Sequence, residues 1–192
     1  MKTLLITGFE PFGGESINPS WEAVKQLPDA VGDYTLYKLG LPTVYGKAPE
    51  ILLRKADEIR PDVIICVGQA GGRDAVTPER IGVNIRAARI ADNAGILLDG
   101  DRIKADGPAA YFSTLPVEKI RDTIRAAGIP AAVSNSAGTF VCNDVLYSLL
   151  HHYARTNVRC GFIHVPWLPE QGTPNLSLEQ TVQALTAAID AL

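Results

Sequence analysis

One cysteine, three histidines and a few carboxylates are the side chains that could carry out nucleophilic chemistry in this sequence. Cys142 lies where a loop of small residues, 134–138, meets an apolar-periodic stretch that predicts a helix. A thiol in the first turn of a helix faces unpaired backbone N–H groups and the positive end of the helix dipole, which favours the thiolate. Cys142 is therefore a candidate nucleophile, and its position alone is equally consistent with a cysteine that only packs.

The three histidines limit the choice of a base for that thiol. His151 and His152 fall near the end of the helix that starts at Cys142. With a rise of about 1.5 Å per residue they lie more than about 10 Å away along that helix. His164 ends an apolar strand, where it is either a satisfied core side chain or a partner for Cys142 at the same rim of the sheet. A thiolate and an imidazole together are the working pair of a cysteine hydrolase.

A third group would orient the imidazole and stabilise its positive charge, as a carboxylate does in catalytic triads. Glu79, which follows Pro78 at the entrance to a short apolar segment, is the best candidate, although the sequence alone does not choose it over other carboxylates. Asp74 and Asp144 are its rivals, and a solvated loop carboxylate is the plain alternative for each. The other two cysteines, Cys66 and Cys160, lie in apolar strand segments and are expected to pack.

The elements that must position these side chains alternate along the chain in an α/β pattern. Apolar runs of strand length alternate with amphipathic segments of helix length, which favours βαβ units and a largely parallel sheet. The predicted strands are 3–7, 34–39, 62–67, 81–85, 131–134 and 160–165, and the predicted helices are 19–27, 45–60, 116–127, 140–154 and 177–192. Segment 81–85 is expected to be an antiparallel or edge element. In such sheets the loops after the strands carry the function.

The length and composition are those of an ordinary globular domain. The 192 residues suit a single domain over 1–192, with 46% apolar and 20% charged residues. Eighteen basic against 21 acidic residues give a net charge of −3, which argues against a nucleic-acid surface. Three cysteines without a CxxC spacing fit neither a disulfide framework nor a zinc site. With no signal-like or membrane-spanning segment, we expect a cytoplasmic protein that needs no membrane. The cysteine chemistry considered above implies no metal and no organic cofactor.

Glycine-rich loops after two strands offer a different interpretation. Residues 8–14 and 68–72 could bind a nucleotide or a phosphorylated metabolite, but they contain neither GxGxxG nor GK[ST]. Glycine after a strand more often marks a tight turn. A second alternative is a redox-sensing or structural protein in which Cys142 is oxidised without being catalytic.

Five segments, taken in order, resemble the pyroglutamyl peptidase I family, also called pyrrolidone-carboxylate peptidase. The likeness extends from the first strand to the last helix, and five matching segments are far more specific than one. They are Gly8-Phe9-Glu10-Pro11-Phe12-Gly13 with Asn18-Pro19-Ser20, Gly68-Gln69-Ala70-Gly71-Gly72-Arg73, Glu79-Arg80-Ile81, Ser136-Ala137-Gly138-Thr139-Phe140-Val141-Cys142-Asn143 and Phe162-Ile163-His164-Val165-Pro166.

The resemblance implies a cytosolic cysteine peptidase that removes N-terminal pyroglutamyl residues from peptides through a thioester intermediate. It implies a single-domain three-layer sandwich with a twisted, largely parallel central sheet, and the triad Glu79, Cys142 and His164. It also implies a substrate site formed by Phe9, Phe12, Asn18, Thr43, Gln69, Arg89, Phe140 and Val141, with Arg89 in the segment associated with oxyanion stabilisation. A homotetramer is expected by the same resemblance, with residues 94–98 and 167–168 as candidate contacts.

A neutral lactam explains why such a pocket would be built from aromatic and amide side chains. Pyroglutamate carries its nitrogen in a ring amide, so no carboxylate or metal is needed to bind a charged amine. Aromatic faces can flank the flat ring, while Asn18 or backbone groups could satisfy its N–H and C=O. Leaving such a buried group unpaired costs about 1 to 3 kcal/mol, so a prolyl residue should be rejected.

Overall fold

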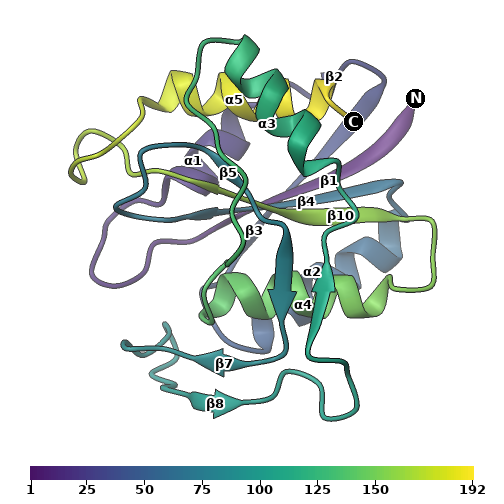
Figure 1. Cartoon of the computed structure of the whole chain (residues 1–192), viewed down its shortest axis with the longest axis vertical. Helices are drawn as coiled ribbons and strands as arrows, with labels where there is room; N and C mark the ends of the chain where they lie inside the picture. The colour runs from purple at the N-terminus through teal and green to yellow at the C-terminus, as the bar shows by residue number, and fades with distance from the viewer.

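A six-stranded sheet forms the centre of the molecule (Figure 1). The computed structural model describes all residues from 1 to 192. Four parallel strands carry the sheet, with short antiparallel strands at its two edges. In spatial order the strands are β2 (Ala30–Val31), β3 (Tyr34–Leu41), β1 (Lys2–Phe9), β4 (Val63–Gln69), β10 (Arg159–Val165) and β5 (Thr77–Pro78). The predicted fold class, a three-layer α/β sandwich with a largely parallel sheet, is confirmed.

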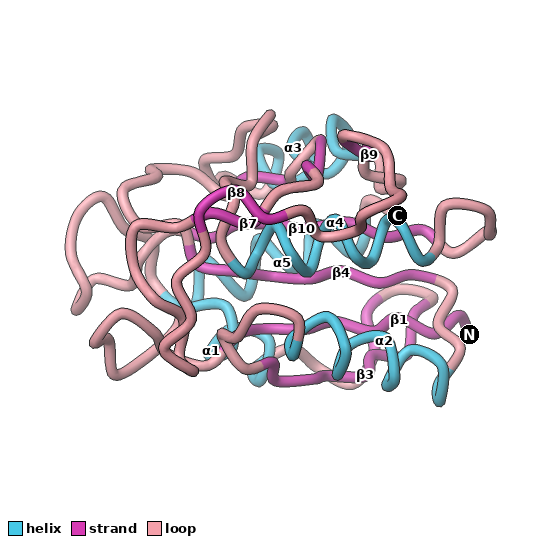
Figure 2. Tube along the Cα trace, turned by 90° about the horizontal axis from the view of Figure 1, so that it is seen from below, coloured by secondary structure: helices cyan, strands magenta, loops and turns pink.

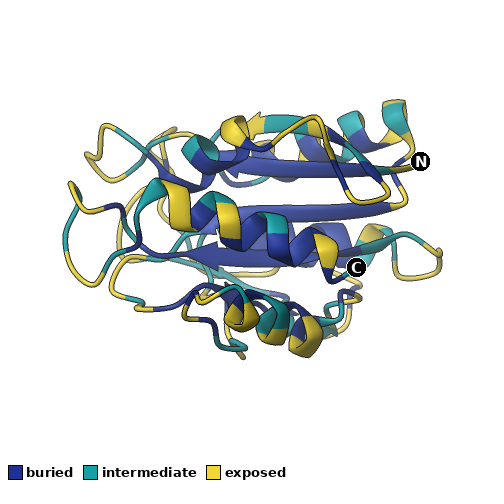
Figure 3. Ribbon diagram, turned by 90° about the horizontal axis from the view of Figure 1, so that it is seen from above, coloured by how far each residue is buried: buried dark blue, intermediate teal, exposed yellow.

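Helices cover both faces of the sheet, and each face has its own apolar core. On one face pack α1 (Pro19–Gln26), α3 (Val117–Ala126) and α5 (Leu178–Asp190), and on the other α2 (Lys47–Ile59) and α4 (Val141–His152). The strands alternate between the two cores: Leu4 and Ile6 of β1 join the first, while Leu5 joins the second. Figure 3 shows the strands buried between helices whose outer faces are exposed. Burial on both faces explains the continuous apolar runs of the central strands.

The predicted helices all form, within a few residues of their expected ends. Among the strands one prediction is wrong: segment 131–134 makes only isolated bridges, from Ala131 to Val76 and from Ser134 to Glu79. Segment 81–85 is indeed antiparallel, but it stands outside the main sheet, where β6 (Ile81–Val83) pairs with β9 (Ala110–Phe112). A second pair joins β7 (Arg86–Ala87) to β8 (Asp99–Asp101). Of these short strands, β6, β7 and β9 contact α4.

The carboxyl ends of the four parallel strands meet at one rim of the sheet. Registers pair Phe9 with Leu41 between β1 and β3, and His164 with Gly68 between β10 and β4. Figure 2 shows the long loops collected at this end, opposite the end where the chain termini lie. The rim therefore holds the loops for which the sequence analysis predicts a function.

None of the helices has the length and apolar character needed to cross a bilayer.

Candidate active site

Cys142 occupies the second position of α4 and touches the end of β4. The glycine at position 68 makes this contact: a methyl group built there would lie 2.9 Å from the Cys142 sulfur and 2.7 Å from the Phe162 ring. Only a residue without a side chain lets the sulfur pack directly on the strand. Part of the Cys142 side chain remains accessible, whereas Cys66 and Cys160 are buried in strands, as predicted.

His164 reaches the same place through the sheet register. Its strand, β10, pairs in parallel with β4, and the residue opposite His164 is Gly68, on which the sulfur rests. His164 and Cys142 both line one cavity. The thiol and the imidazole do not form a hydrogen bond with each other, and catalytic contacts of this kind often shorten only when substrate binds.

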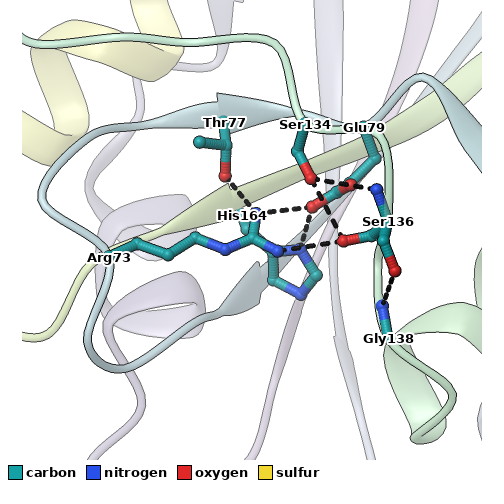
Figure 4. Close-up of polar contacts among 7 residues, drawn as sticks. All are labelled: Arg73, Thr77, Glu79, Ser134, Ser136, Gly138 and His164. Carbon is teal, nitrogen blue, oxygen red and sulfur yellow. Dashed lines mark hydrogen bonds and ion pairs between the residues drawn. The ribbon is translucent and has the colours of Figure 1, made fainter.

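Glu79 completes a buried pair with His164 (Figure 4). Its Oε1 lies 2.6 Å from His164 Nδ1, and neither side chain has more than a few per cent exposure. Edge strand β5 produces this contact: its antiparallel pairing with β10 sets Thr77 opposite His164 and carries Glu79 to Phe162, so that Glu79 lies diagonally across from His164. When Nδ1–H donates to the carboxylate, the lone pair of the neutral ring is on Nε2. The imidazole is thereby held in the tautomer that a general base needs.

Arg73 also belongs to this cluster, although the sequence analysis did not predict it as a site residue. Its Nη1 lies 2.6 Å from Glu79 Oε1 and also donates to Thr77, while Nη2 donates to the Ser136 carbonyl at 3.1 Å. The guanidinium therefore ties the carboxylate to the loop that leads into α4. Arg73 also lines the cavity. Arg73 belongs to one of the segments that resemble the peptidase family, but the sequence does not reveal which residues its guanidinium contacts, because tertiary structure sets those contacts.

Burial and charge set the protonation states of the three residues. Burial raises the pKa of the Cys142 thiol to about 12, helped by the negative charge of Glu79. The helix start favours the thiolate, and burial acts in the opposite direction. Burial lowers the pKa of His164 from its ordinary value of 6.5, although the hydrogen bond to Glu79 opposes this shift. Burial alone would raise the pKa of Glu79, but the His164 hydrogen bond keeps it below its ordinary value.

A neutral thiol beside a neutral imidazole predicts a distinct pH dependence. The thiolate fraction below the pKa rises about tenfold per pH unit, so the rate of Cys142 alkylation by iodoacetamide should still be climbing between about pH 7 and pH 9. Any hydrolysis that uses this pair should be lost as the pH falls through the His164 pKa, which lies below 6.5, because the imidazole must be unprotonated to accept the thiol proton. Mass spectrometry of the labelled chain measures the first and initial rates the second. An alkylation rate that reached a plateau below about pH 8 would contradict the raised thiol pKa.

The first turn of α4 supplies backbone donors next to the sulfur. Phe140 is the N-cap residue and no side chain caps the turn, which leaves its first N–H groups free of a side-chain partner. The Asn143 side chain instead links the turn to β6: its Oδ1 accepts from the backbone N–H of Val83, and its Nδ2 donates to the Val83 carbonyl. Asp144 binds Arg86 at 2.8 Å and the Gly46 N–H, so this rival of Glu79 stabilises the helix start rather than facing His164.

The cavity at the rim has a volume of about 280 Å³. Six of the eight residues predicted to bind substrate line it, namely Phe9, Phe12, Asn18, Thr43, Gln69 and Phe140. The rings of Phe12 and Phe140 lie 5.7 Å apart. The lining that the sequence did not assign is Ala70, Gly71, Arg73, Ala137 and Gly138. Aromatic walls with few polar groups suit a small, flat, uncharged ligand.

Two predicted residues lie elsewhere. Val141 is fully buried in the core beneath α4, because neighbouring residues of a helix point about 100° apart and Cys142 faces the cavity. Arg89 is exposed in the loop after β7 and does not line the cavity. Neither residue lines the cavity in this structure.

Glu10 joins three segments of the cavity wall. Its backbone carbonyl accepts from Asn18 Nδ2 and from the Thr43 hydroxyl, and its carboxylate accepts from the Thr43 N–H and from Asn93. Asn18 is further committed as the N-cap of α1, where its Oδ1 accepts from Ser20. Asn18 is thus a structural residue that keeps at most one amide N–H for a ligand.

Known proteins resemble this chain in sequence and in structure. The sequence model of a family described as pyroglutamyl peptidase matches residues 1–192. A pyrrolidone-carboxylate peptidase of Levilactobacillus brevis is 50% identical over 98% of this chain and 96% of its own length. The crystal structure of the pyroglutamyl peptidase I of Bacillus amyloliquefaciens superposes with a TM-score of 0.96 at 47% identity, covering 99% of this chain and 94% of that one. A pyrrolidone carboxyl peptidase of Thermococcus litoralis, 40% identical, also gives 0.96, covering 100% and 93%.

Proposed function

The chain belongs to the pyroglutamyl peptidase family, and we propose that it removes N-terminal pyroglutamyl residues from peptides with Cys142 as nucleophile, His164 as base and Glu79 as the orienting carboxylate. One observation carries this assignment of roles. His164, held at 2.6 Å by Glu79, is the register partner of Gly68, on which the Cys142 sulfur rests, and Cys142 and His164 line the same aromatic cavity.

The geometry supports an acyl-transfer mechanism. His164 Nε2 takes the thiol proton as the sulfur attacks the pyroglutamyl carbonyl, and the charge on Glu79 stabilises the imidazolium that forms. Backbone N–H groups of the first turn of α4 receive the developing oxyanion. His164 then protonates the leaving amine, which breaks the peptide bond and leaves a thioester. A water molecule that gives its proton to the same imidazole hydrolyses the thioester and restores the thiol.

The cavity supports recognition of a lactam. Phe12 and Phe140 can flank a flat ring, and the cavity contains no carboxylate that would attract a charged α-amine. Gln69 and the backbone of residues 70–71 supply polar groups for the ring amide. Phe9 also lines the cavity, and its ring packs on Phe162 with ring centroids 6.2 Å apart. Arg89 and Val141 have no place in this proposal as side-chain contacts.

The test of the function is a comparison of three amide substrates that share one fluorogenic leaving group. The pyroglutamyl amide should be hydrolysed, and the prolyl and glutamyl amides should react at least about 100-fold more slowly, since each lacks or charges a group that the cavity must pair. Initial rates with and without a chelator give the measurement. Comparable rates on the prolyl amide would contradict recognition of the ring carbonyl.

Residues 1–192 are further proposed to be a single catalytic domain that forms a homotetramer in the cytoplasm, as the family resemblance implies. Support for self-association comes from the loop after β7, where Ile90, Ile96 and Leu97 are between 40% and 59% exposed. Residues 167–168 are less suitable contacts than the sequence predicts, because Leu168 is buried and the Trp167 ring packs on Gly71. Sedimentation equilibrium measures the assembly, and a monomer would contradict it.

A further inference from the structure

A chain of two glutamine side chains runs from the loop after β10 into the cavity. Gln171 lies in this loop, and its amide lies between the backbone of Leu168 and the side chain of Gln69. The loop is fixed nearby, since the Trp167 ring packs so closely on Gly71 that a methyl group there would lie 2.3 Å from it. Gln69 ends β4 and lines the cavity.

The direction of these hydrogen bonds follows from chemistry that allows only one assignment. The Leu168 backbone N–H can only donate, so the Gln171 atom 3.1 Å away must be the acceptor Oε1. The other end of the Gln171 amide is then the donor Nε2. It faces two groups that can only accept, the Glu15 carboxylate at 3.4 Å and the Ile17 carbonyl at 3.5 Å.

The same logic extends one residue further. Gln171 Nε2 lies 3.1 Å from the Gln69 side chain, so the Gln69 atom that faces it must be Oε1. The Gln69 Nε2 is thereby turned away from Gln171, and it has no hydrogen-bond partner within the chain while remaining accessible. The backbone N–H of Leu168, acting through Gln171, thus leaves the Nε2 end of the Gln69 amide available to a ligand in the cavity.

We propose that Gln171 is a positioning residue that makes Gln69 a hydrogen-bond donor to a carbonyl oxygen of the bound substrate. The inference rests on the proposed function and adds to it a specificity device: a group with a fixed donor pairs with an acceptor and rejects a second donor. Without Gln171 the amide could turn over and present an oxygen to the same carbonyl, which is repulsive.

Replacing Gln171 with glutamate tests the direction of the relay. The carboxylate can still accept from Leu168 but cannot donate to Gln69, so Gln69 should turn its Nε2 toward residue 171 and its Oε1 toward the substrate. We expect kcat/KM for the pyroglutamyl amide to fall by about 10- to 100-fold. Gln180→Glu is the matched control, because this exposed capping-box residue of α5 accepts through Oε1, which glutamate reproduces. It should leave kcat/KM unchanged.

A double-mutant cycle separates positioning from a general structural effect. In a Gln69→Met background, Gln171→Glu should change kcat/KM by less than about threefold, because no amide remains to be oriented. An equal loss in both backgrounds would overturn the proposal. So would full recovery of Gln171→Glu by Glu15→Gln, since the loss would then reflect repulsion between two carboxylates. Thermal unfolding and the rate of Cys142 alkylation verify that each variant is folded with its site intact. If the unmodified chain fails to hydrolyse the substrate, the proposed function fails and not the relay.

Discussion

Replacing Cys142 with serine is expected to reduce hydrolysis of a pyroglutamyl fluorogenic amide by at least about 10⁴-fold, the scale seen when a triad loses its nucleophile. A hydroxyl is far harder to deprotonate than a thiol. His164 is a weak base for that task because burial lowers its pKa. The variant should fold normally, since the oxygen is smaller than the sulfur it replaces. Rates at saturating and at low substrate, with thermal unfolding alongside, provide the measurement.

Cys160→Ser is the matched control for this variant. Cys160 is buried in β10, where Thr114 Oγ1 lies 3.9 Å from its sulfur, and it does not line the cavity. Its replacement should lower the melting temperature through burial of a hydroxyl while hydrolysis is retained. Iodoacetamide should label Cys142 before Cys66 or Cys160, as peptide mapping would show. Full activity in the Cys142→Ser protein would end the hypothesis that this thiol is the nucleophile.

Glu79→Gln is expected to lower kcat by about 10³- to 10⁴-fold, with a much smaller change in KM. The amide removes the charge that stabilises the imidazolium, and its NH₂ group can turn toward His164 Nδ1 and hold the ring in the wrong tautomer. Arg73 opposes that rotation, because it donates to the same Oε1 as His164 and would then face the NH₂ group; the loss of charge acts in either orientation. Steady-state kinetics at several pH values would measure the change.

A surface carboxylate provides the control for the loss of charge. Glu118 pairs with Arg80 at 2.6 Å, but both side chains are more than a third exposed and lie outside the cavity. Glu118→Gln removes the same charge and should leave kcat unchanged, as expected for an exposed ion pair. If Glu79→Gln lost less than about tenfold, Glu79 would be a buried structural carboxylate and not the residue that orients His164.

Much of the fold could be predicted because its signals are local. Continuous apolar runs and amphipathic periods fix the central strands and all five helices. The same periodicity could not exclude a strand at 131–134, which is apolar enough but finds only isolated partners at Val76 and Glu79. Nor could it predict that Ile81 pairs with Phe112, because such a pairing depends on where the intervening chain turns.

The site shows the same division between local and tertiary information. Cys142 and His164 could be selected from their places at a helix start and a strand end, and Glu79 only through the family resemblance. Arg73 and Gln171 could not be assigned, since a surface loop and a site residue look alike until their partners are known. The pKa of the thiol also depends on tertiary burial, which opposes the thiolate that the helix start favours and which a local pattern does not reveal.

The contact between the Cys142 sulfur and Gly68 has a stereochemical consequence. The sulfur rests on the strand at Gly68 beside the Phe162 ring, and Cys142 lines the cavity, so a bound substrate would reach the sulfur from the cavity side. A pocket that holds a flat ring in one orientation then presents a single face of the scissile carbonyl to that sulfur. The tetrahedral adduct would then form with a single configuration at the attacked carbon. Gly68, an achiral residue, would thus help to set the configuration of a chiral intermediate.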